Sequence, residues 1–85
     1  MKTRVAVISV IVEDSSSVER LNAILSEYRD YIIGRMGVPY REKNVSIICV
    51  AVDAPEDAIN TLTGKIGRLH GISAKTNFSN LVTEA

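Results

Sequence analysis

The sequence predicts an α+β fold of the ferredoxin-like βαββαβ type, with two helices on one face of a four-stranded antiparallel sheet. Residues 5–12 and 45–52 are apolar at nearly every position, as in strands buried on both faces. Residues 32–38 and 72–79 are apolar mainly on one face, as at sheet edges. One amphipathic helical segment follows each buried strand. Right-handed crossovers then bring both helices to the same face and the two buried strands to the centre.

A helix is predicted to follow the first strand. Apolar residues recur at three- and four-residue spacing from Val18 to Tyr28, and residues 13–17 break the strand pattern before them. Ser16 and Glu19 fit a capping box, in which each side chain satisfies the backbone N–H of the other residue. We therefore expect Ser16 to cap an amphipathic helix of about three turns.

The second strand is expected over about residues 32–38. It contains Gly34 and Gly37, and glycines in a short strand often mark a bulge or a close backbone approach. We expect Pro39 to end it. The polar residues 41–44 then predict the turn of a hairpin that leads into the third strand.

The second helix is predicted by Asp53 and the acidic residues that follow, because Asp53 can cap a helix whose first turn is negatively charged. Its apolar stripe extends to Leu69, and Gly71 supplies a stop. The last strand alternates over residues 72–79, and we expect the tail beyond Leu81 to fray. The whole chain, residues 1–85, is predicted to be one domain with its core between about residues 4 and 79.

Composition excludes several classes of function. Ten basic residues balance ten acidic ones, which argues against direct binding of nucleic acid. The buried strands contain no aromatic residue on which RNA bases could stack. Cys49 is the only cysteine, so an intrachain disulfide is impossible and a reducing compartment is the simpler interpretation. No apolar run approaches the ~20 residues of a membrane span, and we expect a cytoplasmic protein with no membrane partner.

One face of the predicted sheet has no helix to cover it. The first strand offers two apolar rows for that face, either Ala6, Ile8, Val10 and Val12 or Val5, Val7 and Ile11, and the sequence leaves the choice open. An exposed apolar patch of this size normally marks an interface. We therefore expect self-association, as a homodimer or homotetramer, through the free face or a paired sheet edge. The alternative is that the chain termini fold back over the sheet.

The densest unusual string is GRMGVPYR at residues 34–41. Glycines let a ligand approach the backbone, and Arg35, Tyr40 and Arg41 could hold an anionic or carboxylate group. The structural alternative is a bulged edge strand that leads into a hairpin. If a ligand binds, we expect it at the subunit boundary, near the loop of residues 14–17. The candidate ligand-binding residues are Gly34, Arg35, Met36, Gly37, Tyr40 and Arg41.

Metal and catalytic chemistry have little support in the sequence. Cys49 and His70 are the only soft metal ligands, whereas a metal site usually needs three or four. We expect no metal site within one chain; a site shared between symmetry-related copies stays open. No pair of acidic or histidine residues suggests a catalytic centre, so we expect no enzyme activity and assign no catalytic residue.

Three stretches point to a known family: IIGRMGVPYRE at residues 32–42, LTGKIGRL at 62–69 and GISAK at 71–75. They resemble the regulators of the iron-only hydrogenase system. These are small stand-alone domains of the ACT-like group, similar also to the C-terminal sensing domain of nickel-responsive repressors. The resemblance spans about residues 4–78.

The resemblance implies a regulatory role connected with assembly or expression of iron-only hydrogenase. It implies an oligomeric ACT-like domain that senses a small-molecule effector at a subunit interface; the cofactor, if any, is unknown. The alternative is an adaptor for a protein partner, with no small ligand. Two features depart from related domains. Residues 13–17 lack the glycine common in amino-acid-binding ACT loops, and one histidine with one cysteine falls short of the nickel sensor's ligand set.

Overall fold

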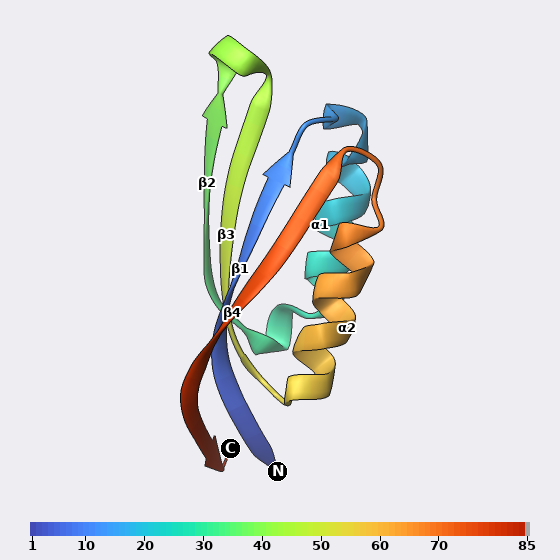
Figure 1. Ribbon diagram of the computed structural model, residues 1–85. Helices are drawn as coiled ribbons and strands as arrows, with labels where there is room; N and C mark the ends of the chain where they lie inside the picture. Colours follow the sequence, from blue (N-terminus) through green and yellow to red (C-terminus); the bar gives the residue numbers. More distant parts are fainter. Residues whose placement is uncertain (85) are drawn as a thin grey trace.

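The computed structural model describes residues 1–84 and confirms the predicted βαββαβ order (Figure 1). The four strands form one antiparallel sheet in the order β2-β3-β1-β4, so the two strands with continuous apolar runs are central, as predicted. Two helices cover one face. The elements are β1 (Lys2–Val12), α1 (Val18–Glu27), β2 (Ile32–Tyr40), β3 (Val45–Ala54), α2 (Glu56–Gly67) and β4 (Ile72–Glu84), with 3-10 turns at Ser15–Ser17, Arg29–Tyr31 and Arg41–Lys43.

The hydrophobic core lies between the sheet and the helices. The even-numbered residues of β1 and β3 point into it, because directly paired residues of neighbouring strands share a face. Their burial settles which row of β1 faces the helices. The largest fully buried side chains are Ile8, Val10, Val50 and Val52 from the sheet and Leu21, Ile59, Leu62 and Ile66 from the helices.

The opposite face of the sheet has no helix over it. We call this the uncovered face; β1, β2 and β3 present on it Val5, Val7, Ser9, Ile11, Gly34, Met36, Val38, Tyr40, Ile47, Cys49 and Ala51. On β4, the same face carries the polar residues Ser73, Lys75 and Asn77. The termini do not fold back over it, since the first residues of β1 pair with the last residues of β4.

Both helices begin differently from the prediction. Residues 15–17 form a separate 3-10 turn, so the prediction that Ser16 caps the first helix is wrong. Instead, the Asp14 carboxylate accepts a hydrogen bond from the Ser16 N–H. α1 has Ser17 at its N-cap position, without a side-chain cap. Asp53 does not cap α2 either, because β3 continues through it and the helix begins only after Pro55.

Two strand ends also differ from the prediction. Pro39 lies inside β2, which is tolerated because an edge strand has one side without ladder partners. The tail does not fray after Leu81: β4 continues to Glu84 and pairs with the start of β1. Arg4 holds this part of β4, since its Nε and Nη2 donate to the Ser79 carbonyl at 3.0 and 2.8 Å.

Candidate functional site

A hollow of about 450 Å³ lies where the β2–β3 hairpin meets the β1–α1 loop. We call it the cradle; its lining residues are Ser15, Pro39, Tyr40, Arg41, Asn44, Val45 and Ser46. Three of these residues carry a hydroxyl, one an amide and one a guanidinium, and none of the seven is acidic. The donors suit an anionic or carboxylate group, because arginine binds such groups through charge-assisted hydrogen bonds.

The hairpin end positions the polar side of the cradle. Residues 41–43 form a 3-10 turn that ends at Asn44, whose φ of 52° lies in the left-handed region that asparagine tolerates better than most residues. The Tyr40 hydroxyl donates to Glu42 Oε2 at 3.1 Å. This contact holds the Glu42 carboxylate beside the Tyr40 hydroxyl. Arg41 is exposed.

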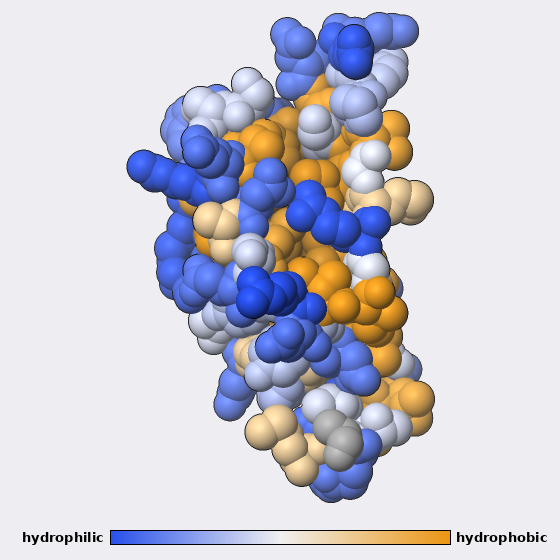
Figure 2. Space-filling model, turned by 180° about the vertical axis from the view of Figure 1, so that it is seen from behind, coloured by the Kyte–Doolittle hydropathy of each residue, from blue (hydrophilic) through white to orange (hydrophobic). Residues whose placement is uncertain are grey.

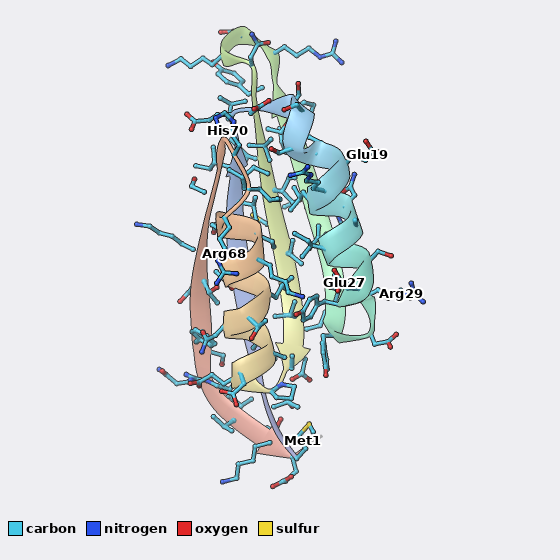
Figure 3. All side chains as sticks on the ribbon, turned by 90° about the vertical axis from the view of Figure 1, so that its right-hand side faces the viewer. Met1, Glu19, Glu27, Arg29, Arg68 and His70 are labelled. Atoms are coloured by element: carbon cyan, nitrogen blue, oxygen red, sulfur yellow. The ribbon has the colours of Figure 1, made fainter. Side chains whose placement is uncertain are left out.

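The β1–α1 side of the cradle is held by a cluster of hydrogen bonds around Asp14. Its Oδ1 accepts from the N–H and hydroxyl of Ser16 at 2.9 and 2.7 Å, and its Oδ2 lies 2.7 Å from His70 Nδ1. These bonds, those from Ser16 first and that with His70 next, lower the pKa of Asp14 to about 2. Ser17 Oγ donates to the His70 carbonyl at 2.7 Å. The loop beside Ser15 is therefore tied to the α2–β4 turn, at the end of the molecule opposite Met1 (Figure 3).

Five of the six candidate residues from the string at 34–41 line three different hollows, and Gly37 lines none of them. Tyr40 and Arg41 line the cradle, beside the loop of residues 14–17 as expected. Gly34 and Met36 line a hollow of about 290 Å³ on the uncovered face, and Arg35 also contributes to its lining. Gly37 pairs with Ile48 on the helix side of the sheet, and a Cβ there would meet only Ile48 Cγ1, at 3.7 Å.

Arg35 points toward α1 rather than toward Arg41. Its Nη2 donates to Asn22 Oδ1 at 3.2 Å, and both residues line a hollow of about 270 Å³ between α1 and β2. Consecutive side chains of a strand point to opposite faces, which separates Arg35 from Met36. One chain therefore brings together Tyr40 and Arg41 but places Arg35 elsewhere.

Among the polar residues that line the cradle, sequence reasoning did not name Asn44 and Ser46, and it included Ser15 only as part of the loop of residues 14–17 expected nearby. Asn44 carried a usable signal, because an asparagine directly after a polar turn commonly adopts a left-handed conformation. Ser46 carried none, since only the tertiary structure brings its side of β3 to the hollow.

No group of three or more His, Cys, Asp or Glu side chains that could hold a metal ion occurs within residues 1–84. Cys49 lies on the uncovered face, opposite Ser9 and Met36 in the sheet register, whereas His70 pairs with Asp14 at the end of the molecule. As for membranes, neither α1 nor α2 has the length and apolar character of a membrane-spanning helix.

Comparison with protein families gives a match over residues 4–76 to a model described as "TM1266-like: Iron-only hydrogenase system regulator, putative". The description names a regulator and no enzyme activity. None of the curated proteins matches the chain.

Two solved structures are similar to this one. The uncharacterized protein TM1266 from Thermotoga maritima is 28% identical, with a TM-score of 0.85; the match covers 89% of this chain and 96% of that one. A formyltetrahydrofolate deformylase from Pseudomonas putida KT2440 is 14% identical, with a TM-score of 0.65, over 91% of this chain and 29% of that one. The second likeness concerns the fold alone.

Proposed function

The chain belongs to the TM1266-like family of iron-only hydrogenase system regulators, and from this premise we propose that it is a self-associating regulatory domain that senses a small anionic ligand in the cradle. The observation that carries the proposal is the convergence of Arg41 with three hydroxyls and an amide in a hollow without acidic lining. Such a donor set favours a carboxylate or a similar anion over a cation.

The position of the cradle suits a sensor. It lies between the hairpin and the β1–α1 loop, and Tyr40 belongs both to the cradle and to the uncovered face. A ligand held there stabilises the hairpin end in one position, which in turn sets the shape of a surface available to a second copy. Ligand binding and self-association would then influence one another reciprocally.

Thermal unfolding against a panel of ligands tests the sensing function. The panel contains amino acids and other small carboxylates, nucleotides, iron–sulfur-related metabolites and divalent metals. A ligand at 100 times its dissociation constant stabilises the folded state by about 2.7 kcal/mol. We expect a selective rise in melting temperature with one class of anion. A flat panel on folded protein would contradict the sensing function.

The substitution Arg41→Ala tests the placement of the ligand. Since a charged hydrogen bond contributes about 1.5–3 kcal/mol, we expect Arg41→Ala to weaken binding of the panel's ligand by roughly 10- to 100-fold. Isothermal titration measures the loss. Arg35→Ala is the matched control, because that arginine faces α1 and donates to Asn22. A larger loss at Arg35 than at Arg41 would place the ligand in the hollow between α1 and β2.

A second candidate function, a protein–protein adaptor without a small ligand, is favoured by the apolar character of the uncovered face. A defined partner whose capture is indifferent to added metabolites, together with a flat panel, would support the adaptor over the sensor.

A further inference from the structure

We propose that the uncovered face holds a second copy of this chain, packed face to face about a two-fold axis. The inference rests on the self-association in the proposed function and identifies the surface that forms it. Figure 2 shows hydrophobic atoms gathered along the side of the molecule away from the helices. Four steps lead from this face to the second copy.

The apolar residues of the face form continuous rows across the sheet. In one row Val38, Ile47 and Ile11 are cross-strand partners, and the row ends on β4 at Ser73. The parallel row through Val7 ends on β4 at Asn77. Three neighbouring strands therefore supply an apolar centre and the fourth a polar border. This arrangement is the usual anatomy of a protein interface, with an apolar core inside a polar rim.

The apolar area of the patch supplies most of the surface that each partner buries in a standard dimer interface. Seven large apolar side chains on this face are between 38% and 65% exposed. At roughly 150–200 Å² for a fully exposed large side chain, they offer about 600 Å² of apolar surface. Monomers rarely expose more than a few hundred Å² in one patch, whereas a standard interface buries ~800 Å² on each partner.

The absence of charge inside the patch favours a second copy over other occupants. A two-fold axis brings identical residues near one another, so a charge close to the axis would face its own like. The residues that β1, β2 and β3 contribute to the uncovered face, as defined above, are all uncharged. Charged residues next to them on the same face are Asp53, opposite Val5 near the end of β3, and Lys75 on the border strand β4, opposite Ser9. A nucleic acid or an anionic membrane would call for clustered basic residues instead.

The shape of the uncovered face allows it to fit against the same face of a second copy. Gly34 and Ala51 are cross-strand partners with little or no side chain, and they lie in the hollow of about 290 Å³. Met36 lines the same hollow and is 65% exposed. Each copy thus presents an unbranched, adaptable side chain and a hollow beside it. A two-fold arrangement lets the methionine of each copy fill space on the other.

Sedimentation equilibrium of the full chain tests the proposal, with Ile47→Glu and Val7→Glu as variants. Both residues lie on central strands, so neither change touches an edge through which strands could pair. Like charges brought together across an interface cost enough to raise the dissociation constant by at least about 100-fold. Asn60→Glu, the same added charge on the exposed side of α2, is the matched control and should self-associate as the wild type does.

Far-UV circular dichroism and cooperative thermal unfolding check that each variant is folded. If one of Ile47→Glu and Val7→Glu does not fold, the other provides the test. A wild-type dimer that survives Asn60→Glu and dissociates with Ile47→Glu or Val7→Glu supports the proposal. A wild type that is monomeric at micromolar concentrations overturns it, and so does a dimer that folded Ile47→Glu and Val7→Glu leave intact. Neither of these results removes a ligand-induced rise in melting temperature, so failure of this surface is distinguishable from failure of the sensing function.

Discussion

Gly71 occupies a position in this fold that only glycine fits. Its φ is +69°, and a Cβ built there collides with the Cβ of Asp14 and lies 3.0 Å from the Asp14 backbone nitrogen. The Gly71 carbonyl in turn accepts from the Glu13 N–H at 2.7 Å. The close approach of these two chain segments therefore depends on the absence of a side chain at residue 71.

We expect Gly71→Ala to destabilise the protein by at least about 2 kcal/mol, because it combines an unfavourable left-handed conformation with a collision against backbone. Gly64→Ala is the control. Gly64 lies inside α2 with open space except for the far end of Arg68, so alanine there should stabilise by about 0.5–1 kcal/mol. Urea unfolding measures both. Equal effects of the two substitutions would contradict the assignment.

The candidate residues were predictable in type but not in grouping. The arginine and tyrosine pattern of residues 34–41 predicted anion-binding chemistry, and two of its members, Tyr40 and Arg41, do lie in one hollow. The alternation of side chains along β2 sends Arg35 to the helix side of the sheet, where Asn22 engages it. When the register of a strand is uncertain, its sequence alone does not show which side chains share a face.

At the scale of elements, the β1–α1 loop and the α2–β4 turn are joined through Asp14, Ser17 and His70. Asp14 also receives two hydrogen bonds from Ser16, which satisfy the start of the 3-10 turn rather than the start of α1. The predicted capping box failed because the Asp14 carboxylate accepts from the Ser16 N–H, the backbone donor that Glu19 was expected to satisfy. Local hydrogen bonds of this kind are short-range alternatives that sequence patterns do not rank.

This junction makes stability depend on acid. The folded state lowers the pKa of Asp14 from 3.8 to about 2, so its carboxylate stabilises the fold above about pH 4 and loses that contribution as the pH falls toward 2. We expect the difference in unfolding free energy between wild type and Asp14→Asn to be constant near neutral pH and to shrink over that window. Urea unfolding at a series of pH values measures it.

Ser16→Ala provides the control for this pH dependence. It removes the hydroxyl that is the largest cause of the lowered pKa, so the Asp14 carboxyl should titrate closer to its ordinary value. A carbon-13 NMR titration of the Asp14 carboxyl reports the change directly. An unchanged titration curve in Ser16→Ala would contradict the role assigned to this hydrogen bond.

At the scale of the whole molecule, the two faces of the sheet differ in what covers them. One carries the core and both helices; the other leaves large apolar side chains exposed in a chain of only 85 residues. Small domains bury a modest fraction of their surface, so the proposed second copy on the uncovered face would add stability that the monomer lacks. Folding and association would then be coupled through protein concentration.

We therefore expect the melting temperature of the wild type to rise with protein concentration, by roughly 3–5 °C for each tenfold increase well above the dissociation constant. Differential scanning calorimetry over two decades of concentration measures the slope. In folded Ile47→Glu the slope should disappear, whereas Asn60→Glu should retain it. A wild-type melting temperature that is independent of concentration would contradict a dimer that dissociates on unfolding.

The sequence alone determined the element order and the central position of β1 and β3. It also determined the likeness to iron-only hydrogenase system regulators and which hydrogen-bond donors residues 34–41 carry. These features could be predicted because periodicity, composition and short motifs are local properties of the chain. Tertiary structure alone decided which apolar row of β1 faces the helices, that β4 continues to Glu84 along β1, and that Ser46 joins Tyr40 and Arg41. These outcomes depend on pairing between residues distant in sequence, where burial against a particular neighbour selects one of two locally equivalent arrangements.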